Sequence, residues 1–318
     1  MAIGVFILQL IYYNRLGLLV ATATLVTGYL ANQSVIAVGN SNTEEGQGFV
    51  VATYNLSLFN RPRNYFSFER SSSQLPAVEP YKKYIQEVSE LAADIKCFQE
   101  FYSLRNDKLF NTVAALKRSN TPYLATLVDT LRMNKSVSGL LIASKYPIIN
   151  TEVVFKPNTG INGAMLADLV IREDTIRVIN FHLQSANYYA IARKNRKNGL
   201  LTVLKKGLYR HKQNYYLKLK QLEKLTEAIK NSPYPLILVG DLNSLPTSAI
   251  YHQINKLMKN SFEQGGKGIG GTLNNQKIPY LRIDNQFCSE EFEVEMAEVN
   301  KQYTRSQHFP LIVKYKLL

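Results

Sequence analysis

The stretch Pro235–Pro246, PLILVGDLNSLP, constrains the fold of this chain more than any other. Leu236–Val239 is an unbroken apolar run with the length of a strand that is buried on both faces. Asp241 and Asn243 follow its carboxyl end, and residues two apart on an extended segment point to the same side. Because Asp and Asn are also common in turns, this stretch alone leaves open whether they form a site or a turn.

The length of 318 residues allows one large domain or two, with enough chain to bury a substantial core. There are 38 Lys and Arg residues against 24 Asp and Glu residues, which gives a formal net charge of +14. This excess favours anionic partners such as nucleic acid, lipid headgroups or phosphate esters. The two cysteines, Cys97 and Cys288, are too few for a disulfide framework.

The N-terminal region is almost free of charge, unlike the rest of the sequence. Leu16–Thr43 holds no charged residue, and Leu16–Leu30 is nearly all apolar or small. We interpret residues 1–39 as a hydrophobic N-terminal helix that anchors the protein in a membrane, with a signal peptide or a buried helical hairpin as alternatives. If Arg15 marks the cytoplasmic side, the remaining chain lies outside the cytoplasm, as in an anchored protein of a bacterial inner membrane. Residues 40–48 are a polar linker, and residues 49–318 form the globular domain.

Seven polar or charged residues lie at or near the ends of predicted strands, in separate parts of the chain. In layered α/β folds such residues converge on one site through the loops that carry them. Carboxylates, amides and imidazoles without a cysteine cluster favour a hard cation with oxygen ligands, such as Mg²⁺. The residues are Asn55, Glu100, His182, Asp241, Asn243, Asp284 and His308.

Several other chemistries lack their motifs in this sequence. Zinc would require a tighter set of His and Cys ligands, and neither HExxH nor CxxC is present. The phosphate-binding motif GxxxxGK[ST] and the nucleophile motif GxSxG are also missing. A cation next to histidines suits the hydrolysis of phosphate esters, in which charge on phosphoryl oxygens is neutralised and a water is activated.

Ala190–Lys230 is a long, helix-favouring segment with a large excess of basic residues. Between residues 193 and 224 there are eleven Lys or Arg residues against one acid, Glu223, and three tyrosines lie among them. Such a segment is either a solvated helix face or a binding surface for an anionic polymer or a membrane. The candidate substrate-binding residues in it are Arg193, Lys194, Arg196 and Lys197.

Seven short motifs occur in an order that resembles the endonuclease/exonuclease/phosphatase superfamily. They are TYN (53–55), CFQE (97–100), GLLIASKYP (139–147), NFHLQS (180–185), GDLNSLP (240–246), RID (282–284) and SQHFP (306–310). The resemblance covers residues 49–318. It implies a four-layer α/β sandwich, in which two packed and mostly antiparallel β-sheets are flanked by helices. It also implies hydrolysis of phosphate ester bonds with Mg²⁺, or with Mn²⁺ as an alternative.

The resemblance implies roles for the metal side of the site. Glu100 would be the principal metal carboxylate, with Asn55 beside it. Asp241 would orient or deprotonate the attacking water, and Asn243 would hold a phosphate oxygen.

The resemblance also implies roles for the histidines, and here the sequence departs from the family pattern. His308 would face the scissile phosphate while Asp284 holds its ring, and His182 matches a second histidine of the deoxyribonuclease and sphingomyelinase branches. The last family motif is normally Ser-Asp-His, whereas Gln307 stands at the aspartate position and offers no charge. We therefore expect a slower or more metal-demanding hydrolase.

Three functions remain open from the sequence. The first is a monomeric, nuclease-like phosphodiesterase, for which the net charge and the basic segment would contact nucleic acid. The second is a phospholipid or phosphoinositide phosphoesterase at the membrane, for which the same charge would contact headgroups. The third is a membrane-tethered binding module in which the change to Gln307 has abolished catalysis.

Overall fold

A computed structural model describes residues 19–20, 22–23, 26–27, 34–39, 48–60, 79–104, 107, 109–128, 136–156, 161–185, 200–276, 278 and 280–318. Within these ranges, no helix combines the length and the apolar character needed to cross a membrane. Most of the predicted N-terminal anchor lies outside the described residues. So do all four candidate substrate-binding residues of the basic segment, Arg193, Lys194, Arg196 and Lys197.

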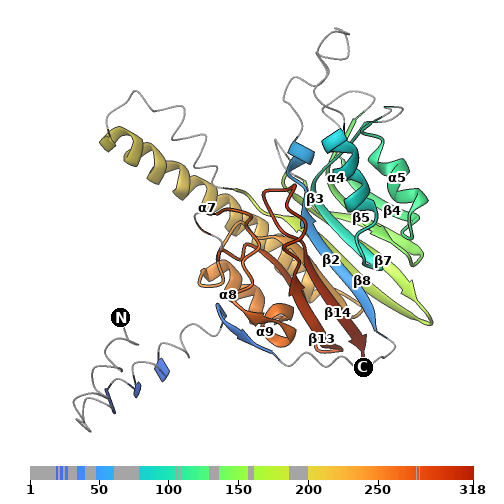
Figure 1. Ribbon diagram of the computed structural model, residues 1–318. Helices are drawn as coiled ribbons and strands as arrows, with labels where there is room; N and C mark the ends of the chain where they lie inside the picture. Colours follow the sequence, from blue (N-terminus) through green and yellow to red (C-terminus); the bar gives the residue numbers. More distant parts are fainter. Residues whose placement is uncertain are drawn as a thin grey trace.

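Two six-stranded sheets form the centre of the domain (Figure 1). The first sheet has the order β13 (Phe292–Val299), β14 (Leu311–Leu317), β2 (Phe49–Asn55), β3 (Ile95–Leu104), β5 (Ser136–Ser144), β4 (Tyr123–Val128). The second has the order β10 (Lys259–Asn260), β12 (Asp284–Cys288), β9 (Leu236–Asp241), β8 (Asp174–His182), β7 (Gly163–Ile171), β6 (Ile148–Phe155). Each sheet has one parallel pair at its centre, β2 with β3 and β8 with β9, and its other pairs are antiparallel.

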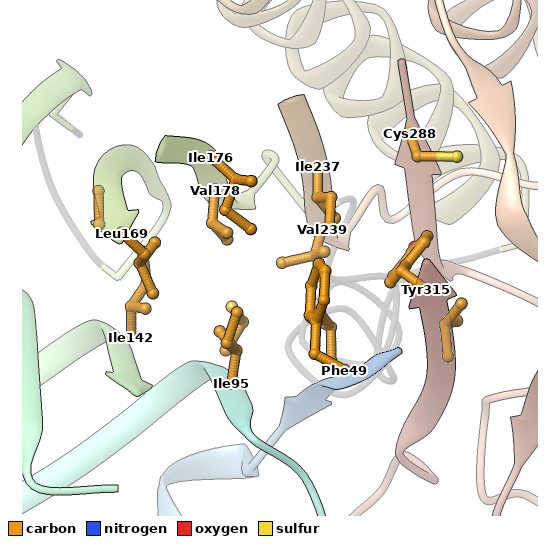
Figure 2. Packing of buried hydrophobic residues seen from close by; sticks show 14 of the residues in the cluster. Phe49, Ile95, Ile142, Leu169, Ile176, Val178, Ile237, Val239, Cys288 and Tyr315 are labelled. Atoms are coloured by element: carbon orange, nitrogen blue, oxygen red, sulfur yellow. The ribbon is translucent and has the colours of Figure 1, made fainter. Parts of the chain in front are cut away.

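The two sheets pack face to face through apolar side chains (Figure 2). Ile95 and Ile142 of the first sheet lie in one buried cluster with Val178, Ile237 and Val239 of the second. All five side chains are fully or almost fully removed from solvent. Burying one such side chain stabilises the fold by roughly 1.5–3 kcal/mol. The apolar run Leu236–Val239 is buried along its whole length, as expected for a central strand covered on both faces.

Helices cover the outer face of each sheet and complete four layers. On the first sheet, α4 (Glu79–Ser89) buries Tyr84 and Val88 in a cluster with Phe98, and α5 (Thr112–Arg118) packs beside it. On the second sheet, α7 (Leu200–Lys230) and α8 (Ala249–Asn255) contribute Leu225 and Ile254 to a third cluster. The predicted sandwich of two mostly antiparallel sheets between helical layers is therefore confirmed.

Short elements connect these layers. The one-turn η1 (Ser57–Asn60) follows β2, and α9 (Ser261–Gly265) precedes β11 (Lys267–Gly268). β11 pairs with β1 (Ala37–Val38), so the last residues before the predicted linker contact the domain. The buried side chain of Arg282 holds this segment, because its guanidinium donates to the carbonyl of Ser34 and lies 4.7 Å from the ring centroid of Phe262.

Two strands differ from what their local apolar pattern indicates. The apolar run of β3 stops at Phe98, before Gln99 and Glu100, but the strand continues to Leu104. The other is the edge strand β6. Most side chains of β6 are partly or fully exposed, so this strand lacks the buried apolar pattern that identifies a strand from sequence.

Candidate active site

The central strands bring six of the predicted site residues to one end of the sandwich. Asn55 ends β2 and Glu100 lies in β3, the parallel pair of the first sheet. His182 ends β8 and Asp241 ends β9, the parallel pair of the second sheet, and the two residues are paired in register. Asp284 begins β12 and is paired with Asp241. The sixth residue, His308, lies just before β14, which is a strand of the first sheet.

A β-bulge in β3 directs Glu100 away from the core. The pairing of β3 with β5 shifts register between Phe98 and Phe101, and Glu100 has a φ of 47°. The preceding Gln99 is fully buried and donates to Asn180 Oδ1 at 2.7 Å, whereas about a quarter of the Glu100 side chain is exposed. The bulge thus separates a core amide from a carboxylate that solvent or a ligand can reach.

Close backbone contact and a tight turn set the position of Asp241. Gly240 has a φ of 149°, and a Cβ at this position would lie 1.9 Å from the carbonyl oxygen of Phe181. Asp241 Oδ1 accepts from the backbone N–H of Asn243 at 2.7 Å, and the Asn243 side chain donates to the Leu183 carbonyl at 3.0 Å. Asp241 and Asn243 therefore do form a turn, and this turn is part of the site. The turn that the sequence left open is confirmed, and the role of Asp241 and Asn243 in a site stays a prediction.

Asn55 and Asp241 join the two sheets across the site. Asn55 Nδ2 donates to Asp241 Oδ2 at 3.0 Å, and both side chains are almost completely buried. Asn55 Oδ1 in turn accepts from the backbone N–H of Ser57 at 3.0 Å. Both oxygens of Asp241 thus accept a hydrogen bond, which fixes the plane of the carboxylate.

Asp284 and His308 form a buried pair. His308 Nδ1 lies 2.8 Å from Asp284 Oδ2, which leaves Nε2 of the ring as its other hydrogen-bonding atom. Burial alone would lower the pKa of His308, but the charge and hydrogen bond of Asp284 outweigh it and raise that pKa to about 9. Burial raises the pKa of Asp284, and the charge of His308 acts against this. The raised pKa of His308 favours the protonated ring while it is paired with Asp284.

His182 is buried between two carboxylates but is not fixed by them. Its Nε2 lies 3.6 Å from Asp241 Oδ2 and 3.9 Å from Glu100 Oε1, and both distances are too long for a hydrogen bond. Its Nδ1 is buried and has no hydrogen-bond partner in the part of the chain that the structure describes. The ring thus has two carboxylates near Nε2 but no hydrogen bond to the described residues that fixes its orientation.

Gln307 lies at the exposed rim of the site. Its backbone carbonyl accepts from the N–H of Asn274 at 2.8 Å, and its side chain makes no hydrogen bond to the described residues. The neighbouring Ser306 is buried and donates through Oγ to the carbonyl of Asn55 at 2.6 Å. The substitution of the family aspartate by Gln307 therefore changes the charge at the rim and leaves the buried contacts of the motif in place.

The polar atoms of this site suit a hard divalent cation. One ligand atom from each of Asp241, Asp284 and His308 lies within 4.8 Å of the others, but His308 Nδ1 and Asp284 Oδ2 are paired with each other, so the carboxylate oxygens are the atoms that remain for a cation. Asp284 Oδ1 is buried without a hydrogen-bond partner among the described residues, and no hydrogen bond to the Glu100 carboxylate is found there either. Carboxylate and amide oxygens are the ligands that Mg²⁺ and Mn²⁺ prefer. Glu100 provides such oxygens, and so do Asn55 and Asp241, which are joined to each other by a hydrogen bond.

Lys218 is a further charged residue next to the site, which the sequence analysis counted only as part of the basic segment. It is nearly buried, and its Nζ donates to Ser244 Oγ at 2.8 Å and to the Asn243 carbonyl. Burial lowers its pKa to about 8, with the charge of Asp241 acting in the opposite direction. Its spacing from Leu222 and Leu225 puts it on the buried face of α7, and this spacing was the available signal.

Comparison with known proteins identifies the family. The sequence profile of the Endonuclease/Exonuclease/phosphatase family matches residues 52–308. This range contains the strands that carry the site, and the protein belongs to this family. No curated protein matches the sequence.

Solved structures with the same fold cover most of the chain at low identity. An endonuclease/exonuclease/phosphatase family protein from Leptotrichia buccalis shares 15% identity over 85% of this chain and 100% of its own, with a TM-score of 0.56. The human Nocturnin catalytic domain with bound sulfate shares 16% identity over 85% and 95%, with a TM-score of 0.55. A mutant beta toxin from Staphylococcus aureus with bound magnesium ions shares 14% identity over 85% and 100%, with a TM-score of 0.53.

Proposed function

We propose that this protein hydrolyses phosphodiester bonds with the help of Mg²⁺, or of Mn²⁺ as an alternative, by attack of a water molecule. The observation that carries this proposal is the buried pair of His308 and Asp284, 2.8 Å apart and beside the carboxylate of Asp241. A cationic imidazole and an anionic carboxylate in one buried site are the acid and the base that hydrolysis of a phosphate ester needs. The beta toxin structure contains magnesium ions and the Nocturnin structure contains sulfate. Binding of a divalent cation and of a phosphate-like anion in these related folds supports the proposal.

Each residue has a role that its contacts support. Asp241, whose carboxylate plane is fixed by Asn55 and the Asn243 backbone, orients the attacking water and takes its proton. His308 Nε2 donates a hydrogen bond to a phosphoryl oxygen or to the leaving oxygen. Asp284 keeps the His308 ring in its orientation.

The remaining site residues bind substrate and metal. Asn243 keeps one amide hydrogen for a phosphate oxygen, since its side chain is anchored to the Leu183 carbonyl through Nδ2. Glu100 and Asn55 are the residues that we propose as metal ligands. A bound divalent cation would neutralise charge on the phosphoryl oxygens.

The test is an activity panel with the full chain. Plasmid DNA, RNA, sphingomyelin and phosphoinositides are each incubated with Mg²⁺, with Mn²⁺ or with a chelator. We expect hydrolysis of at least one substrate that the chelator abolishes, and a loss of about a thousandfold in Glu100→Ala. Glu293→Ala is the matched control, because this carboxylate is half-exposed on β13 beside Lys316. Absence of metal-dependent hydrolysis, or equal activity of Glu100→Ala and Glu293→Ala, would refute the proposal.

A phospholipid substrate is the second candidate, and one observation favours it. Leu208 and Tyr209 of α7 expose 69% and 66% of their surface, which is unusual for side chains of this kind. The net charge of +14 suits nucleic acid and anionic headgroups alike. The panel separates these two candidates directly, because it reports which substrate is cleaved.

We propose, as a separate point, that residues 1–39 anchor the chain in a bacterial inner membrane with the domain on the extracytoplasmic side. The support is the uncharged run Leu16–Leu30 and the single Arg15 before it. A reporter that is active only in the periplasm, fused after residue 318, tests this orientation. No signal from that fusion would reject it.

A further inference from the structure

Helix α7 has a packed part and an exposed part. From Lys218 to the end of the helix, Leu222 and Leu225 are buried against the second sheet. Between residues 205 and 217, every side chain that the structure describes is exposed, with the exception of the half-buried Asn214. We call the described residues of this range, 205–206, 208–210 and 212–217, the α7 surface.

The exposed part begins at the level of the active site. Lys218 donates to the Asn243 carbonyl and to Ser244 Oγ, directly after the end of β9. The 18 residues from 200 to 217 extend about 27 Å at the usual rise of an α-helix. Figure 1 shows α7 projecting past the end of the sheets, away from the rest of the molecule. The α7 surface therefore stands beside the mouth of the site on a helix that is anchored to the catalytic loop.

The α7 surface combines apolar, aromatic and basic side chains. The exposed fractions are 69% for Leu208, 66% for Tyr209 and 57% for Tyr216, and Tyr215 and Leu217 are also exposed. Its charges are Lys205, Lys206, Arg210 and Lys212, and the sequence has no acidic residue from 200 to 222. A helix face that serves only for solubility does not expose leucines and tyrosines in this way.

This composition distinguishes between nucleic acid and a lipid bilayer as the anionic partner. Basic and aromatic side chains suit a phosphate backbone with exposed bases, but leucines find no partner there. The interface of a bilayer accommodates all three kinds, because Lys and Arg contact anionic headgroups, Tyr lies at headgroup level and Leu reaches the acyl boundary. The uncharged run Leu16–Leu30 in the same chain suits the same environment.

We propose that the α7 surface docks on a lipid bilayer that contains anionic headgroups. Docking would bring the rim of the site, with Asn243 and Ser244, close to the headgroup layer. This inference concerns lipid contact and does not depend on hydrolysis. The α7 surface can dock on lipid whether the protein cleaves lipid, cleaves another substrate or has no catalytic activity.

The test places a fluorescent label on the α7 surface of the full chain. Gln213→Cys introduces an exposed thiol that leaves the leucines, tyrosines and charges of the surface unchanged. The natural Cys97 and Cys288 are fully buried, so an environment-sensitive dye reacts with the new thiol. Without divalent cations, we expect fluorescence to rise about twofold and shift to shorter wavelength on vesicles with about 30% phosphatidylglycerol. Vesicles of phosphatidylcholine alone should give little change.

Two controls make the result specific to this surface. A dye on Glu227→Cys, whose side chain is 61% exposed at the packed end of the same helix, should not respond. Adding Lys205→Glu and Arg210→Glu to Gln213→Cys should weaken the response to anionic vesicles about tenfold, because two attractive charges become repulsive. Circular dichroism of each variant verifies that it is folded.

Four outcomes would overturn the proposal. The label at residue 213 does not respond to anionic vesicles, or the label at residue 227 responds equally. Alternatively, the label at residue 213 responds to duplex DNA and not to lipid, which would assign the surface to nucleic acid. Finally, it responds to protein concentration without any vesicles, which would assign the surface to a second copy of the chain.

Discussion

The site contains two buried histidines that are held in different ways. His308 has a carboxylate partner at 2.8 Å, and its pKa is raised to about 9. His182 lies between the carboxylates of Asp241 and Glu100 at 3.6 and 3.9 Å, and its Nδ1 has no hydrogen-bond partner among the described residues. The ring of His308 is therefore oriented by a hydrogen bond before any substrate binds, whereas the ring of His182 makes no hydrogen bond to the described residues.

This difference suggests that the two histidines contribute to catalysis in different ways. An imidazole that is oriented before the substrate binds stabilises the transition state without reorganisation of the site. Such preorganised stabilisation is usually the largest single contribution to the catalytic rate. A ring without such a hydrogen bond contributes mainly after a ligand has supplied its partner. The following substitutions test this difference between His308 and His182, in order of decreasing expected effect.

The largest effect is expected for His308→Gln. The variant loses both the positive charge and the proton on Nε2, so kcat should fall about a thousandfold or more. KM should change far less, since the loss concerns the transition state. Steady-state kinetics on the substrate found in the activity panel measures both parameters. A kcat within about tenfold of the parent would show that His308 is not the acid of the reaction.

The second effect concerns the partner of His308. Asp284→Asn keeps the shape of the side chain but loses its charge, so kcat should fall about a hundredfold and the free energy of unfolding by about 1–3 kcal/mol. Because the folded-state pKa of His308 is raised, its stabilising contribution is fully present below pH 6.5 and disappears as the pH rises through about 9.

Denaturant titrations of metal-free protein between pH 6 and pH 10 test this linkage. The stability difference between the parent and Asp284→Asn should decrease across this range. Lys218, whose lowered pKa acts in the opposite direction, is the same in both proteins and does not affect this difference. Asp168→Asn is a matched control, because Asp168 forms a buried pair with Arg177 far from the site. Equal pH slopes in the parent and in Asp284→Asn would contradict the assignment.

A smaller effect is expected for His182→Gln. This ring makes no hydrogen bond to Asp241 or Glu100 in the protein as described, so kcat should fall only about tenfold. The substitution should change the apparent affinity for Mg²⁺ more than His308→Gln does, because it alters the space between two carboxylates. Metal titrations of activity measure this affinity. A loss as large as that of His308→Gln would remove the proposed difference between the histidines.

The smallest effect is expected for Gln307→Asp, which restores the family charge at the exposed rim. The apparent affinity for Mg²⁺ should increase about threefold to tenfold, with little change in stability, because the side chain is exposed. Gln302→Asp is the control, since it adds the same charge at another exposed position. Activity that occurs only in Gln307→Asp would instead favour the binding-module interpretation of the parent.

Much of the site could be predicted because it follows a local pattern. Asp241, Asn243 and His182 come directly after apolar runs, and such runs become buried strands whose ends meet in a layered fold. The identity of the family followed from seven motifs of this kind. These features depend on residues close together in the sequence, so no knowledge of tertiary contacts was needed.

The remaining features depend on contacts between distant segments. The bulge that exposes Glu100 is defined by the pairing of β3 with β5, which lies some forty residues further along the chain. The spacing of Lys218 from Leu222 and Leu225 indicates its burial, but its contact with the loop after β9 joins segments that are distant in the sequence and could not be predicted from this spacing.

The order of the strands has a consequence for the newly synthesised protein. β13 and β14 are the last strands of the chain, yet they complete the first sheet by pairing with β2. A nascent chain that lacks residues after 300 would hold Asn55, Glu100, His182 and Asp241 but no His308, and the edge of β2 would be open. We therefore expect no catalysis from a chain that has been synthesised only as far as residue 300.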